Sequence, residues 1–344
     1  MSDADTGGSP KVVALGGGHG LHASLSALRR VTDGLTAIVT VADNGGSSGR
    51  LRRQFGVLPP GDLRMALAAL CGDDEWGTTW SRVVQHRFDG EGELSGHSVG
   101  NLLIVALWDL LGDTVEGLDW VGLLLGAHGR VLPMAAVPLD ITAEVVGADP
   151  ERPDGVSIVR GQAACAVTPG RVRSISLVPA EPPACPEAVA AVHEADWIVL
   201  GPGSWFTSVL PHMLVPDLAA SLVNSKARRV VALNLAPQPG ETAGFSPHTH
   251  LEVLAVHAPG LTVDVVLADR SAAGAGPREQ GGSCGHPEPR GLGTPRVAGI
   301  AELEKAAGAL GARLVLADVA MADGSPRHDP HRLAAAYAEI FEGG

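Results

Sequence analysis

A short apolar run that leads directly into a cluster of glycines constrains the fold of this chain more than any other feature. Residues 12–15 (VVAL) form the run. Four of the next five residues are glycines, in the order Gly16, Gly17, Gly18, His19 and Gly20. Leucines at positions 21, 25 and 28 then follow a helical spacing. A strand, a glycine turn and a helix in this order are typical of the phosphate-binding unit of an α/β protein, because glycines let a ligand approach the backbone and the helix offers free amides to an anion.

A second apolar run, residues 37–42, ends in Asp43. This position is about 20 residues past the glycines, where a dinucleotide-binding fold places the acid that binds a ribose hydroxyl. The spacing Gly18-x-Gly20-x-x-Ala23 matches the dinucleotide fingerprint only loosely. The structural alternative is a tight strand–helix turn without a ligand. Taken by itself, the segment 12–43 favours a nicotinamide dinucleotide.

The composition agrees with a parallel α/β protein. Hydrophobic residues make up 45% of the 344 residues but aromatic residues only 3%, which predicts a core of small aliphatic side chains. The net charge of −13 argues against binding to nucleic acid and to anionic membrane surfaces. The start is unlike a secretory signal peptide, and no apolar run approaches the roughly 20 residues that span a bilayer. Four scattered cysteines without a C-x-x-C pair favour a reducing cytoplasm.

The segment 43–50 (DNGGSSGR) is dense in glycines, hydroxyls, and carboxyl or amide side chains. We expect a loop that wraps a polar ligand, with a flexible surface turn as the alternative. Arginines at positions 50, 52 and 53 favour the ligand, because a guanidinium pairs bidentately with phosphate. The candidate contacts here are Asp43, Asn44, Gly46, Ser47, Ser48 and Arg50.

Polar residues also begin two further predicted helices. In PPGDLR, Asp62 is placed either to cap a helix that runs to about residue 70 or to contact a ligand, and Arg64 is placed to offset phosphate charge. In GHSVGN, His97 is either a phosphate or sugar contact or a structural histidine. Asn101 either caps the following helix or bonds the ligand.

The pattern of the opening segment returns near residue 200. A buried strand predicted over residues 195–200 leads into GPGSWFTS, and the next predicted strand, residues 229–235, contains Asn234 near its end. Open α/β sheets bind their ligands at the carboxyl ends of strands. Four strand ends with polar, glycine-rich loops therefore predict one pocket built from several loops. The second half of the chain contributes Gly201, Gly203, Ser204, Thr207 and Asn234 as candidates.

The rest of the chain predicts a single domain over residues 11–344, preceded by a disordered tail at 1–10. Short alternating segments over residues 131–178 predict a β-rich excursion of strands and hairpins. Residues 270–297 are rich in glycine and proline and predict a disordered insertion. Beyond it a helix (300–310), a strand (313–319) and a last helix (330–341) resume the alternation, so the insertion does not end the domain.

Six segments together resemble one family. In chain order they are GGGHGL, VADNGGSSGRLR, PPGDLRMAL, GHSVGNLL, GPGSWFTSVLP and NLAPQPGET. As a set they resemble the YvcK family, within the broader CofD-like superfamily, over residues 11–262, and RHDPHRLAAAY near the end is also similar. The CofD-like transferases, which act on 2-phospho-lactate in the deazaflavin cofactor pathway, lack the GGSSGRLR sequence, which favours the YvcK branch. His19 and Gln162 depart from the family pattern, where Thr and Glu are common.

The resemblance implies a Rossmann-like, mostly parallel sheet flanked by helices in a cytoplasmic protein. It further implies binding of UDP-N-acetylglucosamine and support of cell shape and peptidoglycan synthesis on gluconeogenic carbon sources, without a required cofactor or a known enzymatic activity. Protein partners would belong to cell-wall synthesis or its regulation. The Trp-bearing segment 73–95 is a candidate interface for a homo-oligomer.

Three functions remain open from the sequence. The first is a regulatory protein that binds a nucleotide sugar, with the diphosphate on the first glycine turn. The second is a CofD-like transferase, in which Asp43 and Asp62 would hold Mg²⁺. The third, a nicotinamide enzyme, has the least support, because the remaining loops resemble no dehydrogenase site. No nucleophile with an adjacent base and no metal-ligand motif is evident, so we assign no catalytic residue.

Overall fold

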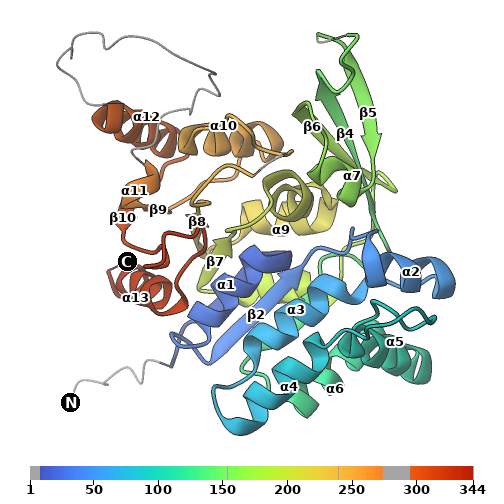
Figure 1. The fold of residues 1–344 in the computed structure, drawn as a ribbon. Helices are drawn as coiled ribbons and strands as arrows, with labels where there is room; N and C mark the ends of the chain where they lie inside the picture. Colours follow the sequence, from blue (N-terminus) through green and yellow to red (C-terminus); the bar gives the residue numbers. More distant parts are fainter. Residues whose placement is uncertain (1–7, 153, 239, 274–294, 344) are drawn as a thin grey trace, which may run out of the picture.

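The computed structural model describes residues 8–152, 154–238, 240–273 and 295–343, whose main element is a seven-stranded parallel sheet (Figure 1). The strand order is β10-β9-β8-β7-β1-β2-β3, so the first strand lies inside the sheet and pairs with β2 and β7. This confirms the predicted mostly parallel α/β architecture. The strands are β1 (Lys11–Gly16), β2 (Gly34–Val39), β3 (Arg130–Pro133), β7 (Trp197–Leu200), β8 (Arg228–Ala232), β9 (Val265–Asp269) and β10 (Arg313–Ala317).

The central strands are largely apolar, because helices cover both faces of the sheet. Every residue of β7 and β9 is buried, and so is every residue of β1 after Lys11. Valine, leucine and alanine supply most of these positions, as the low aromatic content predicts. Trp197 is the large exception, and it packs against Phe341 near the carboxyl end of the chain.

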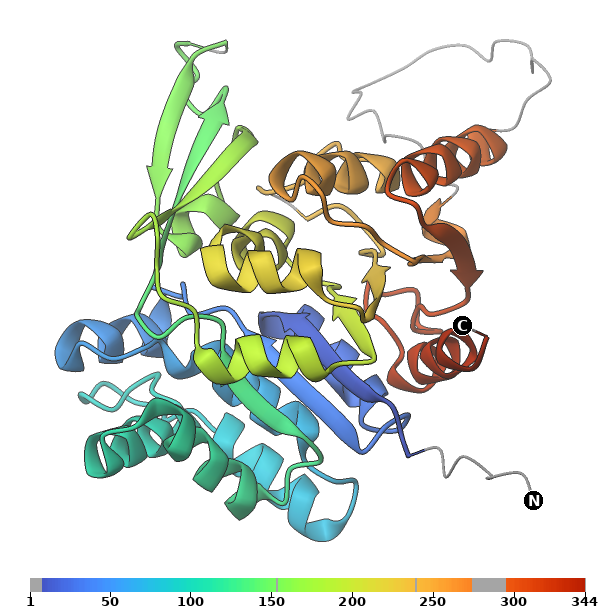
Figure 2. The ribbon, with the colours of Figure 1, turned by 180° about the vertical axis from the view of Figure 1, so that it is seen from behind.

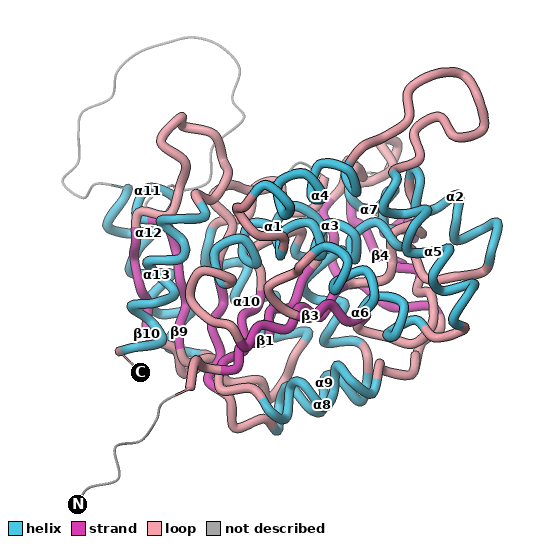
Figure 3. The backbone as a smooth tube through the Cα atoms, turned by 90° about the horizontal axis from the view of Figure 1, so that it is seen from below, coloured by secondary structure: helices cyan, strands magenta, loops and turns pink. Residues whose placement is uncertain are grey.

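Two layers of helices enclose the sheet (Figure 3). One face carries α1 (Gly18–Leu28) and α3 (Pro60–Leu70), which contact each other, with α13 (Pro330–Glu342) against α1. The other face carries α8 (Pro186–Glu194) and α9 (Pro216–Asn224). Pro60, Pro186, Pro216 and Pro330 each stand at the first helical position, where the missing amide costs no hydrogen bond.

The remaining helices lie around this framework. They are α2 (Gly46–Phe55), α4 (Glu75–Gln85), α5 (Val99–Leu111), α6 (Thr114–Leu125), α10 (Pro247–His257), α11 (Arg270–Ala273) and α12 (Pro295–Ala309). A π-helical turn (Trp205–Val209) and a 3₁₀ turn (Leu210–Leu214) follow β7. In the described residues no single helix is both long and apolar enough to cross a membrane. One bent pair of helices, Trp205–Leu214 with Pro216–Asn224, reaches that length and apolar content only when its two parts are taken together.

A small antiparallel sheet projects from one end of the molecule (Figures 1 and 2). Its order is β5-β4-β6, formed by β4 (Asp140–Val146), β5 (Val156–Arg160) and β6 (Arg171–Val178). The β-rich excursion predicted over 131–178 was therefore too long at its start, because residues 131–133 belong to β3 and pair with β2 in the main sheet. A short helix that the strand pattern concealed, α7 (Gln162–Ala166), lies between β5 and β6.

Two segments expected to be disordered are partly ordered. Of the tail 1–10, residues 8–10 are described, and the Ser9 hydroxyl donates a hydrogen bond to the Thr32 hydroxyl (3.0 Å). Of the insertion 270–297, the two ends belong to α11 and α12, while residues 274–294 and 1–7 lie outside the described residues. The alternation of helix and strand resumes after this insertion, as predicted.

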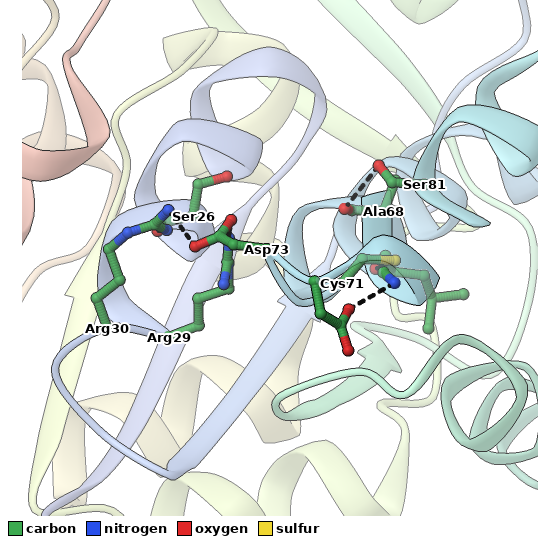
Figure 4. Close-up of polar contacts among 10 residues, drawn as sticks. Ser26, Arg29, Arg30, Ala68, Cys71, Asp73 and Ser81 are labelled. Carbon is green, nitrogen blue, oxygen red and sulfur yellow. Dashed lines mark hydrogen bonds and ion pairs between the residues drawn. The ribbon is translucent and has the colours of Figure 1, made fainter. Parts of the chain in front are cut away.

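Polar contacts fasten the end of α1 to the segment between α3 and α4 (Figure 4). Arg29 and Arg30 both pair with Asp73, the second at 2.7 Å, and the pairing with Arg29 lowers the pKa of Asp73. The Ser81 hydroxyl of α4 donates to the Ala68 carbonyl at 3.2 Å. Because Asp73 is 65% exposed, its ion pairs contribute little to stability; they connect the end of α1 to the segment before α4.

Candidate functional site

The strand order creates a topological switch point beside β1. The chain passes from β1 to β2 on one side, whereas β7 adds to the other side of β1 and the sheet then grows through β8. The loops after β1 and β7 therefore leave the sheet on opposite faces and open a crevice between them. Open α/β sheets bind ligands in this place.

The first wall of the crevice is the glycine turn at the start of α1. The backbone at Gly18 has φ +56°, which a side chain would strain. A Cβ atom on Gly20 would come within 2.3 Å of the Pro202 carbonyl oxygen and 2.4 Å of Gly203 Cα. Glycine is thus required for the close approach of the two loops. No side chain caps α1, but the Asp62 carboxyl lies against the Gly18 amide, so it is the amides after Gly18 that remain available to an anion.

The second wall is the turn after β7. The Asn234 side chain binds the Gly203 backbone twice, accepting from its amide at 2.9 Å and donating to its carbonyl at 2.8 Å. The turn contains a cis peptide bond between Gly201 and Pro202 and leads into the π-helical turn that carries Thr207. Asn234 therefore holds the wall in place, and its amide group is already engaged with protein.

Between the two walls lies a cavity of about 240 Å³. It gathers the first glycine turn, one carboxyl, the hydroxyls after β7 and residues of α7. The lining residues are Gly17, Gly18, His19, Gly20, Asp62, Gln162, Ala163, Ala166, Ser204, Thr207, Ser208 and Gln238. Larger hollows of about 450 Å³ at the amino ends of β1 and β2, and about 550 Å³ beside Phe55, lack such convergent polar turns.

Asp62 is the carboxyl that opens on this cavity. It does not cap α3, because Pro59 occupies the cap position and no side-chain cap forms there, so the capping alternative was wrong. Burial, followed by the charge of Asp43, raises the pKa of Asp62 to about 7. The part of its side chain that protein leaves uncovered faces the narrow cavity. Asp62 therefore exchanges a proton near neutral pH, beside Gly18.

Asp43 and Asn44 lie behind the cavity. Asp43 Oδ1 accepts a hydrogen bond from the Gly45 amide (2.8 Å), and Asn44 Oδ1 accepts from the Ala163 amide (3.1 Å). Asn44 thereby connects the end of β2 to α7. The segment 43–50, which we expected to be a loop, is in large part the first turns of α2 from Gly46. Contact of Asp43 with a ribose hydroxyl stays a prediction.

The remaining polar candidates form a buried network between helices. Ser47 Oγ lies 3.0 Å from His97 Nδ1 and accepts from Asn101 Nδ2 at 3.0 Å, and Asn101 Oδ1 accepts from Arg64 Nε at 3.0 Å. Ser98, and not Asn101, occupies the cap position of α5, so capping by Asn101 was wrong. Burial lowers the pKa of Arg64 to about 10 and also lowers the pKa of His97. These residues join α2, α3 and α5 and do not line the cavity.

Arg50 and Ser48 belong to the same region. Arg50 Nη2 donates to the Ser95 carbonyl at 2.6 Å, so this guanidinium holds the loop before α5. Ser48 is buried, and a Cβ atom on Gly61 would come within 2.2 Å of its hydroxyl, which places it against the start of α3. Ligand contacts by Arg50, Ser48 and Gly46 stay predictions.

Comparison with known proteins then identifies the family. Residues 12–280 match the family described as 2-phospho-L-lactate transferase CofD. A Mycobacterium tuberculosis protein is 51% identical over 325 residues, and the alignment covers 94% of this chain and 88% of that protein. Its provisional name is gluconeogenesis factor. The Listeria monocytogenes gluconeogenesis factor is 41% identical over 261 residues, or 75% of this chain and 77% of its own. The chain belongs to the YvcK family of CofD-like proteins.

A solved structure agrees with this assignment. A Bacillus halodurans protein, described as a member of the UPF0052 family, is 33% identical and superposes with a TM-score of 0.76 over 94% of this chain and 97% of its own. The Bacillus halodurans protein thus shares the fold of this YvcK-family chain, including the switch point, over almost the full length of both chains. The resemblance stated from the six sequence segments is confirmed.

The structure adds residues to the site that the sequence analysis of this YvcK-family chain missed. Gln162, Ala163 and Ala166 come from α7, and Gln238 from the loop after β8. Glu241 is buried behind that loop and accepts hydrogen bonds from the Phe206 amide (3.2 Å) and the Thr207 hydroxyl. Gln238 and Glu241 stand in the segment NLAPQPGET, which the family resemblance marked and which belongs to one of the four strand ends with polar, glycine-rich loops.

Metal binding has limited support from the side chains. Within the described ranges, no group of three or more His, Cys, Asp or Glu side chains could enclose an ion. The charge of Asp43 contributes to the raised pKa of Asp62, and the Asp62 carboxyl lies against the glycine turn. Two carboxylates can share a hydrated Mg²⁺ together with the phosphates of a ligand, because this ion keeps several waters.

Proposed function

We propose that this protein binds a nucleotide sugar, UDP-N-acetylglucosamine, in the cavity between the two turns and acts as a regulator. The observation that carries the proposal is the meeting, at the switch point, of the amino end of α1 with a turn rich in hydroxyls. Amides suit phosphate, and hydroxyls suit a sugar. The family resemblance supplies the choice of nucleotide and of sugar.

In this arrangement the diphosphate lies along Gly17 to Gly20, at the positive end of the α1 dipole. Asp62 carries a proton in part of the molecules at neutral pH, because its pKa is raised to about 7, and this reduces its repulsion of the phosphates. A volume of about 240 Å³ is below that of a typical pocket for a whole ligand of this size, so the nucleoside extends out of the cavity.

A binding role is favoured over catalysis. In the described part of the chain, no hydroxyl that lines the cavity is hydrogen-bonded to a histidine that could serve as its base; Thr207 is instead bonded to Glu241. Following the resemblance, the proposal places the protein in the cytoplasm, where ligand binding would govern peptidoglycan synthesis and cell shape during gluconeogenic growth, through protein partners of cell-wall synthesis. It requires no cofactor.

A second candidate is a transferase of the CofD type, acting on a nucleotide-linked phospho-lactyl donor with Mg²⁺. Two observations favour it: the family match carries the description of that enzyme, and Asp43 lies close enough to Asp62 to raise its pKa. If Mg²⁺ binds, these two carboxyls would hold it against the ligand phosphates. The residues of the cavity would then orient the donor.

Titration calorimetry of the purified protein with UDP-N-acetylglucosamine, UDP, NAD and GTP tests the proposal. We expect UDP-N-acetylglucosamine to bind well below millimolar concentration and more tightly than NAD or GTP. Gly308→Ala is a matched control, because a Cβ atom on Gly308 meets nothing within 4 Å and the residue lies in α12, away from the cavity. Failure to bind any UDP-sugar would sink the proposal, and turnover of a deazaflavin substrate with Mg²⁺ would replace it with the transferase.

A further inference from the structure

Glu241 lies directly behind the hydroxyl wall of the cavity. It is 2% exposed and belongs to the loop between β8 and α10. Its Oε1 accepts from the Thr207 hydroxyl and its Oε2 from the Phe206 amide (3.2 Å). The Ser204 hydroxyl and the Thr207 amide also lie near this carboxyl and lower its pKa. Glu241 does not line the cavity, whereas Ser204 and Thr207 do.

These bonds decide what the hydroxyls can offer to a ligand. A hydroxyl has one hydrogen to donate and two lone pairs to accept with. Because Thr207 donates its hydrogen to Glu241, only its lone pairs remain for the cavity. Burial raises the pKa of Glu241 above its ordinary value, and the hydrogen bonds from the Thr207 hydroxyl and the Phe206 amide oppose that shift, since such donors favour the charged acceptor.

Two side-chain amides, those of Gln162 and Gln238, lie beside these hydroxyls at the cavity. Gln162 Nε2 donates to the Thr207 carbonyl at 3.2 Å, which engages a donor of that side chain with protein. Gln238 Oε1 is buried and has no hydrogen-bond partner among the described residues. Both residues line the cavity. The acceptor on this side of the cavity is therefore the Thr207 hydroxyl, while the glycine turn opposite presents amide donors.

We propose that Glu241 is a positioning residue that fixes the Thr207 hydroxyl as a hydrogen-bond acceptor, so that this wall selects a ligand group that donates hydrogen bonds. This inference rests on the proposed function and specifies its ligand: a phosphate ester whose attached group is a polyol or carries an amide N–H. A carboxylate at the same position meets only lone pairs and is rejected. The wall thus favours a sugar phosphate over a phospho-lactyl group.

The test compares affinities for UDP-N-acetylglucosamine and for UDP, which lacks the sugar. Calorimetry is carried out on the full chain and its variants Glu241→Gln, Thr207→Val and Thr207→Ser. In Glu241→Gln the new amide can donate to Thr207 and so turn the hydroxyl hydrogen toward the cavity. We expect this variant to lose at least tenfold in affinity for UDP-N-acetylglucosamine and less than twofold for UDP. Thr207→Val should show the same selective loss of affinity. Thr207→Ser, which keeps a hydroxyl, should largely retain the affinity of the unmodified chain.

A double variant shows whether Glu241 acts through Thr207. If it does, the double variant Glu241→Gln with Thr207→Val loses much less affinity for UDP-N-acetylglucosamine than the two single fold-losses multiplied together. Independent, multiplying losses would overturn the inference. Glu302→Gln is the matched control, since Glu302 is exposed on α12 and pairs with His248 far from the cavity, and it should alter neither affinity.

The outcomes separate the two proposals. If the ratio of the two affinities in Glu241→Gln is the same as in the unmodified chain, whether or not both affinities fall, the positioning role is overturned while nucleotide-sugar binding stays in place. Absence of any UDP-ligand binding by the unmodified chain would overturn both. If Glu241→Gln does not fold, the comparison of Thr207→Val with Thr207→Ser decides, because equal affinity ratios in those two variants contradict an acceptor role for the hydroxyl.

Discussion

Asp62 joins the chemistry of the cavity to the stability of the chain. Its pKa of about 7 lies above the ordinary 3.8, because burial and the nearby Asp43 oppose its charge. The folded chain therefore holds this proton more tightly than the unfolded chain does. The stabilisation from the proton is complete below about pH 4 and is lost as the pH rises toward 7.

Asp62→Asn should remove this dependence, because the amide stays neutral and can still accept from the Gly18 amide. The difference between the two pKa values corresponds to at most roughly 4 kcal/mol, and water in the cavity reduces it. We expect the variant to unfold at a higher temperature than the unmodified chain at pH 8 and at a similar temperature at pH 4. Calorimetric melting across this range measures the effect.

Asp73→Asn provides a control of opposite sign. Its hydrogen bond with Arg29 lowers the pKa of Asp73, so the carboxylate stabilises the fold above its ordinary pKa. This variant should therefore be no more stable than the unmodified chain at pH 8. A gain in both variants would contradict the role assigned to Asp62.

Gly20→Ala should disrupt the contact between the two glycine turns. The added Cβ atom would lie 2.3 Å from the Pro202 carbonyl oxygen, and backbone cannot give way as a flexible side chain can. We expect a loss of about 1–3 kcal/mol in unfolding free energy, measured by urea denaturation. Gly308→Ala should instead be neutral or stabilising by up to about 1 kcal/mol, because it improves helix propensity in open space.

At the scale of elements, the polar network fixes α2 and α5 against α3. Its members are Ser47, His97, Asn101 and Arg64, and all are buried. Since the network lies beside the cavity without lining it, it sets the position of α3, which carries Asp62, and not the shape of the ligand contacts.

Asn101→Ala tests this network. It removes the acceptor of Arg64 Nε and the donor to Ser47 at once, leaving a buried guanidinium with fewer partners. We expect a loss of about 1.5–3 kcal/mol in unfolding free energy by urea denaturation. Asn224→Ala, whose side chain is bonded to the Ala220 carbonyl at an exposed site, should change it by less than about 0.5 kcal/mol. Equal effects would contradict a special role for the network.

Elements with a local signature could be predicted from the sequence, and those set by distant contacts could not. The pattern of β1, the glycine turn and α1 is contiguous, and so is that of α8. The start of α2 was missed because Gly46, Ser47, Ser48 and Gly49 have poor helix propensity. Tertiary contact overrides that propensity, since the two serines and Gly49 are buried. The place of α7 in the cavity depends on Asn44, more than a hundred residues earlier in the chain, which no periodicity reveals.

At the scale of the whole molecule, the last helix completes the layer that holds the glycine turn. Ser24 of α1 and Tyr337 of α13 share a buried hydrogen bond of 2.9 Å across 313 residues of sequence. The carboxyl end of the chain thus stabilises the helix that begins at the site.

Tyr337→Phe should lower the free energy of unfolding by about 1–2 kcal/mol, because it leaves the Ser24 hydroxyl buried without a partner. Urea denaturation measures the change. The double variant Ser24→Ala with Tyr337→Phe should recover part of the loss, since neither polar group then remains unsatisfied. A double variant that loses the sum of both single effects would contradict this account.

The position of β1 between β2 and β7 also sets an order of events during protein synthesis. β2 leaves the ribosome soon after β1, but β7 begins only at Trp197. At translation rates of about 5–20 residues per second, β1 waits on the order of ten to forty seconds for its second neighbour. Until then the nascent chain has the glycine turn with one edge of its strand unpaired, and a binding site with only one wall.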